Sequence, residues 1–392
     1  MRFLHTADWH LGRTMRGRSR AAEFEAVFAE LAAIVRAERI DVMLVCGDIW
    51  DTASPAPESD RLLYEALREF IGLRVQVVLI AGNHDSPRKL EALGRLSDLL
   101  GVYTQPYVKR PDGGGVLPLR AGEEVASIAA IPWIPEGRLI DAEEVLGPEA
   151  ERHQQYADRA AAIYRASCAG LTPETINIVA GHLFVDGARL AATDRSERLL
   201  HIGRAYGVNA AALPSTPQYI ALGHIHRPQP LAAVAAPAAY SGSLLQLDFG
   251  ELGQQKSVRI VDAHPGRPVE QRELLLSAGR PLVELRGSLD AVLARAQEVA
   301  GAYVRVRLEM ERPEPGLAQR VRDAIPLAVE VRLEFAAAPE QAPGSQLAHL
   351  SPAELFARYY RSQHGAEPAP ELLVLFARLF EEATRLETGA IA

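Results

Sequence analysis

Five short apolar runs in this chain of 392 residues each end in polar side chains that can bind a metal ion, and this repetition constrains the fold more than any other feature. The runs are RFLHTADWH, DVMLVCGDIWD, VQVVLIAGNHD, TINIVAGHL and YIALGHIH. Each run has the length of a β-strand, and helix-like segments such as residues 22–38 and 59–71 lie between them. This alternation predicts an α/β fold whose sheet is covered on both faces.

The polar residues at the ends of these runs are expected to meet at one edge of the fold. In α/β sheets, ligands lie beyond the carboxyl ends of the strands. The residues concerned are Asp8, His10, Asp48, Asn83, His84, Asp85, His182, His224 and His226. Taken singly, each short motif is more often a turn or a hydrogen-bonded surface residue. The ordered set is hard to obtain from core packing alone, so we interpret it as a binding site.

The residue types indicate what this site binds. Carboxylate, imidazole and amide groups without a thiolate suit Mn, Fe or Zn, whereas an all-oxygen set would favour Ca or Mg. We therefore expect manganese. The set contains seven candidate ligands, too many for one tetrahedral ion with an open position: Asp8, His10, Asp48, Asn83, His182, His224 and His226. Two ions about 3.5–4 Å apart can activate a hydroxide and clamp a phosphate, so the sequence predicts hydrolysis of a phosphoester.

Charge and cysteine content limit the classes of protein and the cellular compartments that fit this chain. The formal net charge of −8 is unlike that of a protein that coats nucleic acid. One stretch is locally basic, which fits either a nucleic-acid contact or a solvated loop, through Arg13, Arg16, Arg18 and Arg20. Two distant cysteines, Cys46 and Cys168, support neither a disulfide framework nor a thiolate zinc site. There is no signal-like amino terminus and no bilayer-length apolar run, so we expect a cytoplasmic protein without membrane association.

The motifs also carry a family resemblance. Their order, D-x-H, GD, GNH-D, GH and GH-x-H, resembles that of the calcineurin-type metallophosphoesterase superfamily over roughly residues 1–260. Five longer motifs resemble those of the SbcD family of bacterial SbcCD nuclease subunits, and more distantly those of Mre-type nucleases. They are HTADWHLG, VCGDIWD, AGNHDSP, LGHIHRPQ and YSGSLLQLDFGE. The resemblance implies a two-sheet α/β sandwich with a dimetal site between the sheet ends, expected here as a nuclease domain over residues 1–278.

The resemblance also implies roles for individual residues. One Mn²⁺ would be held by Asp8, His10, Asp48 and His226, and a second by Asp48, Asn83, His182 and His224. His84 would contact the scissile phosphate and protonate the leaving oxygen. Asp85 is expected to orient His84. Asp51 has no assigned role, because some relatives outside the bacterial branch carry a histidine at its position.

The remaining chain predicts two further parts. Residues 281–335 show the pattern strand, helix, strand, helix, strand, expected as a small α+β capping domain over 279–338 that in the family caps the cleft and helps hold DNA. A C-terminal segment, 345–392, predicts two amphipathic helices, the first with a capping box from Ser351 to Glu354. These helices can pack on the body or bind a partner, and the resemblance implies the coiled-coil base of an SbcC-type ATPase.

These expectations combine into one function and two alternatives. We expect a Mn-dependent DNA nuclease subunit, an exonuclease on duplex ends and an endonuclease on single strands and hairpins, acting in DNA repair and recombination. A homodimer of the chain would join two ATPase copies in a heterotetramer, and ATP use would come from the partner because no Gly-x-x-x-x-Gly-Lys-Ser/Thr string occurs here. The alternatives are a metallophosphoesterase for a small substrate such as a cyclic nucleotide, and a scaffold that keeps its ions for structure.

Overall fold

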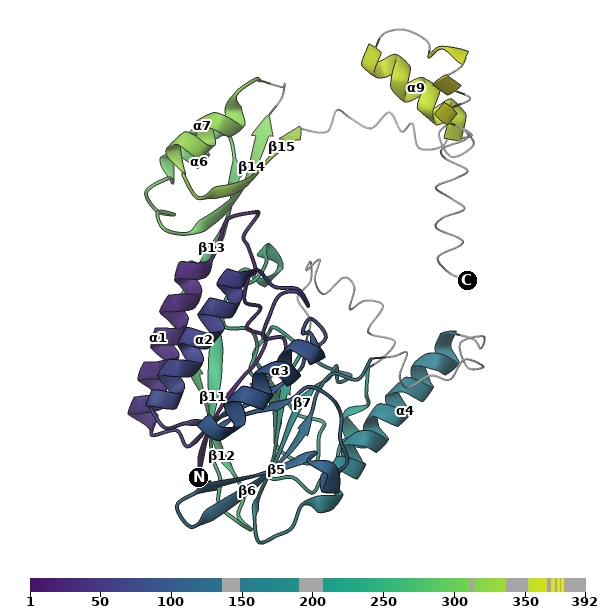
Figure 1. The fold of residues 1–392 in the computed structure, drawn as a ribbon. Helices are drawn as coiled ribbons and strands as arrows, with labels where there is room; N and C mark the ends of the chain where they lie inside the picture. Colours follow the sequence, from purple (N-terminus) through teal and green to yellow (C-terminus); the bar gives the residue numbers. More distant parts are fainter. Residues whose placement is uncertain are drawn as a thin grey trace. The chain divides into compact units, whose positions relative to one another are not determined.

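A computed structural model describes residues 1–135, 149–189, 207–310, 314–335 and 352–364, with short pieces at 368–370, 372–373 and 375–376. Residues 1–309 and 313–334 form one compact unit, and the C-terminal residues form a second. The first unit is built around two six-stranded sheets (Figure 1).

The first sheet has the strand order β12-β11-β1-β2-β3-β4. Its parallel strands are β1 (Arg2–Thr6), β2 (Val42–Cys46), β3 (Gln76–Ile80) and β4 (Val102–Gln105). At one edge lie two antiparallel strands, β11 (Ser257–Asp262) and β12 (Glu270–Leu275). The three strand-like runs that end in Asp8, Asp48 and Asn83 are therefore neighbours in one sheet.

The second sheet has the strand order β5-β6-β7-β8-β10-β9. Its parallel strands are β6 (Glu124–Ile131), β7 (Ile176–His182), β8 (Tyr219–Gly223) and β10 (Ala238–Tyr240). Antiparallel strands close its two edges, β5 (Val116–Ala121) and β9 (Gln229–Leu231). The runs that end in His182, His224 and His226 thus belong to adjacent strands of this sheet.

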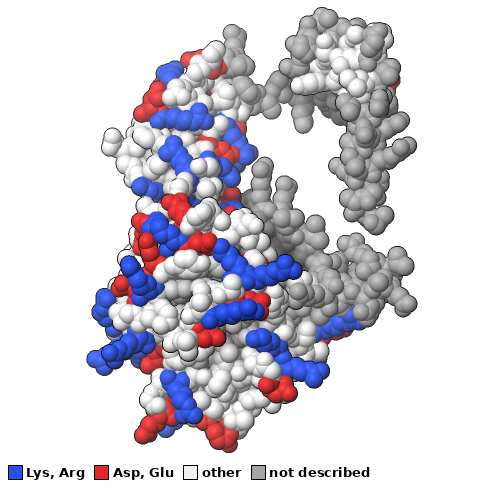
Figure 2. Space-filling model, in the orientation of Figure 1, with Lys and Arg blue, Asp and Glu red and all other residues white. Residues whose placement is uncertain are grey.

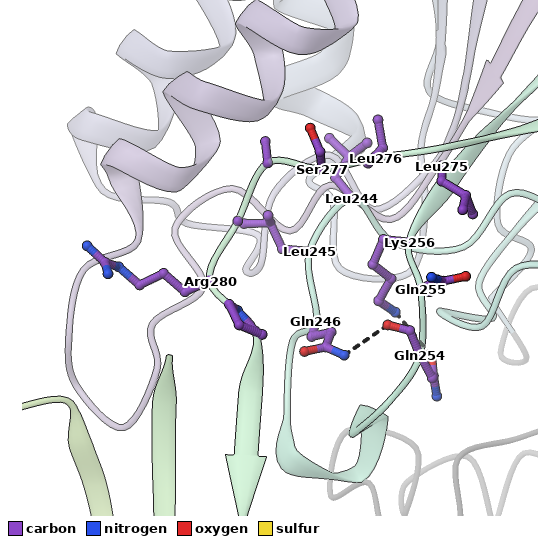
Figure 3. Close-up of a pocket in the computed structure, with 13 residues that line it drawn as sticks. Leu244, Leu245, Gln246, Gln254, Gln255, Lys256, Leu275, Leu276, Ser277 and Arg280 are labelled. Atoms are coloured by element: carbon purple, nitrogen blue, oxygen red, sulfur yellow. Dashed lines mark hydrogen bonds between the residues drawn. The ribbon is translucent and has the colours of Figure 1, made fainter. Parts of the chain in front are cut away.

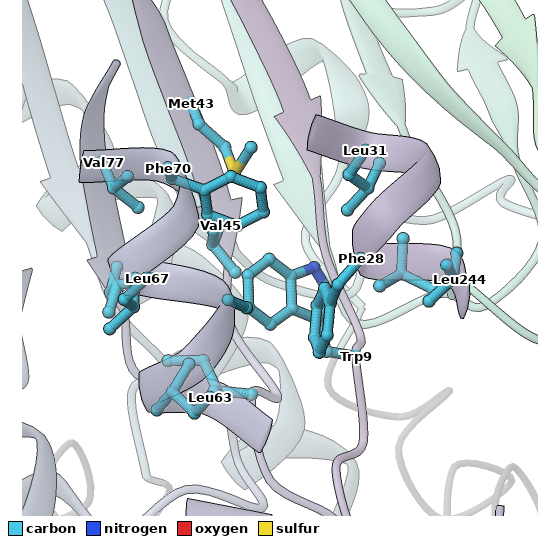
Figure 4. Close-up of a cluster of buried hydrophobic side chains, with 14 of the residues drawn as sticks. Trp9, Phe28, Leu31, Met43, Val45, Leu63, Leu67, Phe70, Val77 and Leu244 are labelled. Atoms are coloured by element: carbon cyan, nitrogen blue, oxygen red, sulfur yellow. The ribbon is translucent and has the colours of Figure 1, made fainter. Parts of the chain in front are cut away.

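Helices cover the outer faces of both sheets (Figure 1). The first sheet carries α1 (Ala21–Glu38), α2 (Pro57–Gly72) and α3 (Pro87–Ser97), and the second carries α4 (Glu149–Ser167). Figure 4 shows the core under α1 and α2, where the rings of Trp9 and Phe28 meet edge to face at 5.0 Å. Phe3, Leu44 and Ile178 belong to the core between the sheets. The predicted two-sheet α/β fold is confirmed.

A smaller sheet follows, in the order β13-β14-β15. Its elements are β13 (Leu282–Gly287), α6 (Leu289–Ala294), β14 (Tyr303–Met310), α7 (Leu317–Ala324) and β15 (Ala328–Phe335). We call these elements the small module. Met15, Phe249, Leu282 and Tyr303 form an apolar cluster that joins this module to the rest of the unit.

The arginine-rich stretch makes contacts within the fold, although the residues Arg16 and Arg18 themselves are exposed. Arg16 lies 3.0 Å from the Glu330 carboxylate of β15, and Arg18 donates a 2.7 Å hydrogen bond to the Pro326 carbonyl. Arg20 is buried and donates to the Glu23 carboxylate and to the Gln246 carbonyl. The stretch therefore fastens the small module to the two-sheet body.

The C-terminal unit contains α9 (Pro352–His364), on which the ring of Phe356 stacks against Phe376 at 4.2 Å. The capping-box residue Ser351, the linker before it and most of the second predicted helix lie outside the described residues. Among the helices that the structure describes, none combines the length and the apolar composition that crossing a bilayer requires.

Candidate metal centre

The strand ends of the two sheets meet closely, and glycines make this approach possible. Gly47 follows β2 with a φ of +86°, and a Cβ built on it would lie 2.2 Å from Nδ1 of His182. A Cβ on Gly223, at the end of β8, would lie 1.8 Å from the carbonyl oxygen of Cys46. Any side chain at these positions would push the two sheets apart. Gly47 and Gly223 therefore let candidate ligands from both sheets converge.

Four candidate ligands adopt left-handed backbone conformations, which are uncommon outside glycine. The φ angles are 52° at Asp8, 49° at His10, 52° at Asp48 and 98° at His224. Hydrogen bonds hold these turns, because His10 N donates to the Asp48 carbonyl at 2.9 Å and His224 N donates to the Asp8 carboxylate at 2.9 Å. Unfavourable backbone of this kind clusters at functional sites, where the surrounding structure enforces it.

Asp8, His10 and His226 form one group of donor atoms, which we call the first half of the centre. One ligand atom from each lies within 4.8 Å of the others, and all three residues are buried. Nε2 of His10 faces Nε2 of His226 at 3.1 Å. Nε2 of His10 also lies 3.5 Å from Oδ2 of Asp48.

Asn83, His182 and His224 form the second half. Oδ1 of Asn83 lies 3.0 Å from Nε2 of His182 and 3.0 Å from Nδ1 of His224. Nε2 of His182 lies 3.6 Å from the same Oδ2 of Asp48. Asp48 therefore lies between the halves, and its neighbours His182, His10 and His84 hold its pKa below the usual range although burial alone would raise it.

The donor set fits a divalent cation in each half. Nδ1 of His182 donates to the Cys46 carbonyl at 2.8 Å, so its Nε2 lone pair points at the oxygens of Asn83 and Asp48. Nδ1 of His226 donates to Glu251 at 3.1 Å, so its Nε2 is the atom that faces His10. A cation that displaces the proton on this Nε2 would find nitrogen and oxygen donors converging from several residues. Separations near 3 Å also match ligands on one ion with bonds of about 2.1 Å.

A buried acidic residue supports His226 from behind. The side chains of Glu251 and Lys256 are 0% and 6% exposed, and the Lys256 ammonium lies 2.7 Å from Oε2 of Glu251. Burial alone would raise the pKa of Glu251, but the charge of Lys256 and the contact with His226 lower it to about 2. Burial would lower the pKa of His226, but the hydrogen bond and charge of Glu251 raise it to about 9.

His84 lies at the solvent-facing side of the centre, half-buried and 4.8 Å from the ring of His10, centroid to centroid. Its Nδ1 donates a 2.8 Å hydrogen bond to the Asp51 carbonyl. Nε2 is therefore the atom left to exchange a proton or to meet a substrate. One of its donor atoms also lies within 4.8 Å of His10 and Asp48, so His84 belongs to the same cluster.

The described contacts of Asp85 are with backbone groups rather than with the His84 ring, and its role in orienting His84 stays a prediction. Its carboxylate accepts hydrogen bonds from the backbone N–H groups of Ile49, Trp50 and Gly82, at 3.2, 2.9 and 2.8 Å. Burial, with the charge of Asp48, raises the pKa of Asp85 to about 6. The residue thus ties the turn after β2 to the turn after β3, while the contact to the His84 ring comes from Asp51.

Sequence reasoning missed three residues that support the centre. Glu251 contacts His226, and Asp51 lies 3.3 Å from Nδ1 of His10 through Oδ1 while its carbonyl holds His84. Trp133, which follows β6, stacks on the His224 ring at 5.0 Å. Asp51 was visible in GDIWD as a second acidic residue, but nothing in the spacing of Glu251 or Trp133 links them to a histidine about twenty-five or ninety positions away.

Charge on the described surface is mixed. Figure 2 shows Lys and Arg side chains interspersed with Asp and Glu side chains on one face of the body and the small module. On that face, the described residues do not form one continuous basic surface. Any contact with a polyanion there has to use individual arginines rather than a uniform positive field.

Comparison with known families gives two matches. Residues 1–228, more than half of the chain, match the family model described as calcineurin-like phosphoesterase. Residues 278–364 match the model described as Type 5 capsule protein repressor C-terminal domain. The first match contains every candidate ligand and His84.

Individual proteins are similar along most of the chain. Identity is 34% over 394 residues to the SbcD subunit of the SbcCD nuclease of Bacillus subtilis (strain 168), with 97% of both chains covered. It is 33% over 385 residues to the protein of the same name from Rhodobacter capsulatus, covering 91% of this chain and 94% of the relative. For Escherichia coli (strain K12) it is 31% over 306 residues, covering 76% and 74%.

Proposed function

Because the chain belongs to the SbcD family of calcineurin-like phosphoesterases, we propose that it is a metal-dependent nuclease subunit that hydrolyses phosphodiester bonds in DNA. The observation that carries this proposal is the pair of donor groups on either side of Asp48 Oδ2, 3.5 Å from His10 and 3.6 Å from His182. The chain uses divalent metal, and the finer assignment is two Mn²⁺ ions that share Asp48. Asp8, His10 and His226 would hold one ion, and Asn83, His182 and His224 the other.

The bound ions supply Lewis-acid activation of water and neutralise charge on the phosphate. The chain itself keeps the ligands in place. The left-handed turns at Asp8, His10 and Asp48 aim their side chains at one point, and Asp85 fixes the turn that carries Asn83. The ligands of the first half are all buried, so a phosphodiester would meet side chains that the surrounding fold already encloses.

His84 would transfer the proton. Its Nδ1–H is committed to the Asp51 carbonyl, so a second proton on Nε2 can pass only toward the open side of the centre. A phosphodiester held there would place its leaving oxygen in reach of Nε2. A group positioned in this way typically contributes about 10²- to 10⁴-fold to the rate.

The partners follow from exposed apolar side chains. Tyr64 on α2 is 49% exposed, and Leu96, Leu99 and Leu100 at the end of α3 and in the following turn are 79%, 97% and 57% exposed. We propose that a second copy of the chain covers them, because Leu96, Leu99 and Leu100 are exposed together within five residues, and clustered apolar groups mark contact surfaces. Leu96→Glu with Leu99→Glu should yield a monomer in light scattering, whereas Leu275→Glu on the distant edge strand β12 should not.

The C-terminal helix would bind the ATPase. Leu355 and Tyr359 of α9 are 41% and 63% exposed, and Leu375 is 49% exposed. We propose that this surface meets the coiled-coil base of an SbcC-type ATPase, giving a heterotetramer of two copies of each chain. Leu355→Asp should abolish co-purification with that ATPase, and Arg358→Gln on the same helix should leave it intact.

One experiment tests the catalytic proposal. The purified full chain is incubated with Mn²⁺ or Mg²⁺ and with end-labelled duplex DNA, hairpin DNA, single-stranded DNA or a cyclic nucleotide. We expect Mn²⁺-dependent cleavage of DNA, and a loss of about 10²- to 10⁴-fold in His84→Ala with both ions still bound.

His264→Ala is the matched control, since His264 is an exposed histidine whose contact is Glu124. Its activity should equal that of the unchanged chain. Hydrolysis confined to the cyclic nucleotide would replace DNA by a small substrate, and full activity in His84→Ala would remove the proton-transfer role.

A further inference from the structure

Both oxygens of the Glu251 carboxylate, which lies behind His226, have partners in the fold. Oε1 of Glu251 accepts from Nδ1 of His226 at 3.1 Å, and Oε2 accepts from Leu247 N at 3.0 Å and faces the Lys256 ammonium at 2.7 Å. The same ammonium donates to the carbonyl of His226 at 2.9 Å. Glu251 and Lys256 therefore fix both the ring and the backbone of this one residue.

The loop that carries Glu251 is fastened on its other side. Figure 3 shows Gln246, Gln254 and Lys256 lining a cavity of about 350 Å³ beside the segment that leads into β13. The Gln246 side chain donates to the Glu251 and Gln254 carbonyls at 3.1 and 2.9 Å and accepts from Leu282 N at 2.9 Å. The position of Glu251 is thus set by the body and by the first strand of the small module together.

The first half has a second carboxylate behind it, and the second half has none among the described contacts of its rings. Oδ1 of Asp51 lies 3.3 Å from Nδ1 of His10. In the second half, His182 is held by a backbone carbonyl, and His224 is stacked on Trp133. A carboxylate behind a ligating imidazole fixes its orientation and raises its basicity, whereas a neutral carbonyl gives a weaker effect of the same kind.

We propose that Glu251 is a positioning residue for His226 and that, with Asp51, it makes the first half bind its divalent ion more tightly than the second half. The inference rests on the proposed two-ion centre. It concerns the order in which the halves fill, which the family assignment leaves open. At limiting metal, the chain would hold one ion beside Asp8, His10 and His226.

Metal binding tests this without a nuclease assay. The full chain is stripped with a chelator and titrated with Mn²⁺, with calorimetry for the two steps and electron paramagnetic resonance for the bound ions. The unchanged chain should fill in a tight step, with the six-line spectrum of an isolated ion, and then a weaker step in which the ions couple. Glu251→Gln should weaken the tight step about 10- to 100-fold and alter the spectrum of the first ion.

Two variants separate the role of Glu251 from a general effect of charge near the centre. Asp248→Asn removes a negative charge from the same loop, where Asp248 pairs with Arg16 rather than with a ligand. Both steps should be unchanged. His226→Ala should remove the tight step, and loss of the weak step instead would overturn the assignment of the halves.

Further outcomes decide against the inference. An unchanged tight step in folded Glu251→Gln, or equal weakening of both steps, overturns it. If Glu251→Gln does not fold, Asp51→Asn decides, since Asp51 is 19% exposed and its change should weaken the same step to a smaller extent. A chain that binds no Mn²⁺ would contradict the proposed function, whereas two ions bound with equal affinity would contradict only this inference.

Discussion

The two halves of the metal centre contain two imidazoles each, but the protein holds those rings by different means. In the first half, His226 is backed by buried Glu251 and His10 lies beside Asp51. In the second half, His182 donates to the Cys46 carbonyl and His224 stacks on Trp133. The difference teaches that the same residue types can have different supporting groups, and such groups set the charge and the freedom to move of a ligand.

The two halves also differ in how far their residues are exposed to solvent. Every residue of the first half is buried, whereas Asn83 of the second half is exposed. Solvent therefore reaches the second half through Asn83, although His182 and His224 are buried. The rings of the first half thus lie beside carboxylates, whereas those of the second half lie beside a carbonyl and an indole.

The largest expected effect comes from removing one imidazole from each half. His226→Ala and His224→Ala should each lose one of the two ions and reduce DNA cleavage to the background level, because neither half alone can clamp a phosphate between two ions. Metal content measured at saturating and at limiting Mn²⁺ distinguishes them. At limiting metal, His224→Ala should still bind one ion tightly, whereas His226→Ala should not.

A result of equal residual binding in both variants would break the comparison, because it would mean that the halves are interchangeable. His264→Ala again serves as the control for losing an imidazole. It should bind two ions.

A fifth buried histidine, His5, lies outside the candidate metal centre, and the described contacts of its ring include no carboxylate. His5 on β1 lies between the sheets, where Nε2 donates to the Leu222 carbonyl at 3.1 Å and Nδ1 accepts from the Tyr219 hydroxyl at 3.0 Å. Burial, with the charge of Arg259, lowers the pKa of His5 to about 3. His5 is thus neutral in the folded chain at pH 7.

Acid should therefore destabilise the fold through His5. Its ordinary pKa in the unfolded chain is about 6.5, so the unfolded state takes up the proton first as the pH falls. The stability is complete above about pH 6.5 and is lost toward pH 3, by as much as about 5 kcal/mol. Urea unfolding in excess chelator, from pH 7 to pH 4, should show a steeper loss for the unchanged chain than for His5→Gln.

Parallel stability curves for these two chains would show that His5 does not titrate on unfolding. The measurement also sharpens the comparison of the halves. It marks the pH below which a loss of metal reflects loss of the fold rather than protonation of a ligand.

The smallest expected effect lies in the neutral half. Trp133→Ala removes the ring stacked on His224, and an aromatic pair of this kind is worth about 0.5–1.5 kcal/mol. The weaker Mn²⁺ step should therefore lose about 2- to 10-fold in affinity, with the tight step unchanged. Trp133→Phe keeps an aromatic face and should lose less. A larger effect on the tight step would contradict the division into halves.

Much of the fold and the positions of the ligands could be predicted, because both depend on local signals. Apolar runs of strand length indicated the two sheets, and polar residues after them indicated which side chains would meet at the strand ends. The structure brings Asp8, His10, Asp48, Asn83, His182, His224 and His226 into one cluster. Their roles as metal ligands remain predictions.

Other features could not be predicted because they depend on contacts between distant segments. The arginine-rich stretch fitted either a nucleic-acid contact or a solvated loop, and its spacing did not indicate that Arg16 and Arg18 contact residues more than three hundred positions away. Asp85 looked like a partner of its neighbour His84, yet its carboxylate bonds backbone N–H groups. Adjacent side chains on a tight turn point in different directions, so proximity in sequence did not imply contact.

The sequence by itself determined which residues end the strands, because the alternation of apolar runs and turns is a local property of the chain. Only the tertiary structure decided what lies behind each of them. Glu251 is twenty-five residues from His226. Its carboxylate reaches the ring because Lys256, in the same loop between β10 and β11, contacts both Glu251 and the carbonyl of His226. Packing in three dimensions, which no spacing rule describes, made the two halves of the centre different.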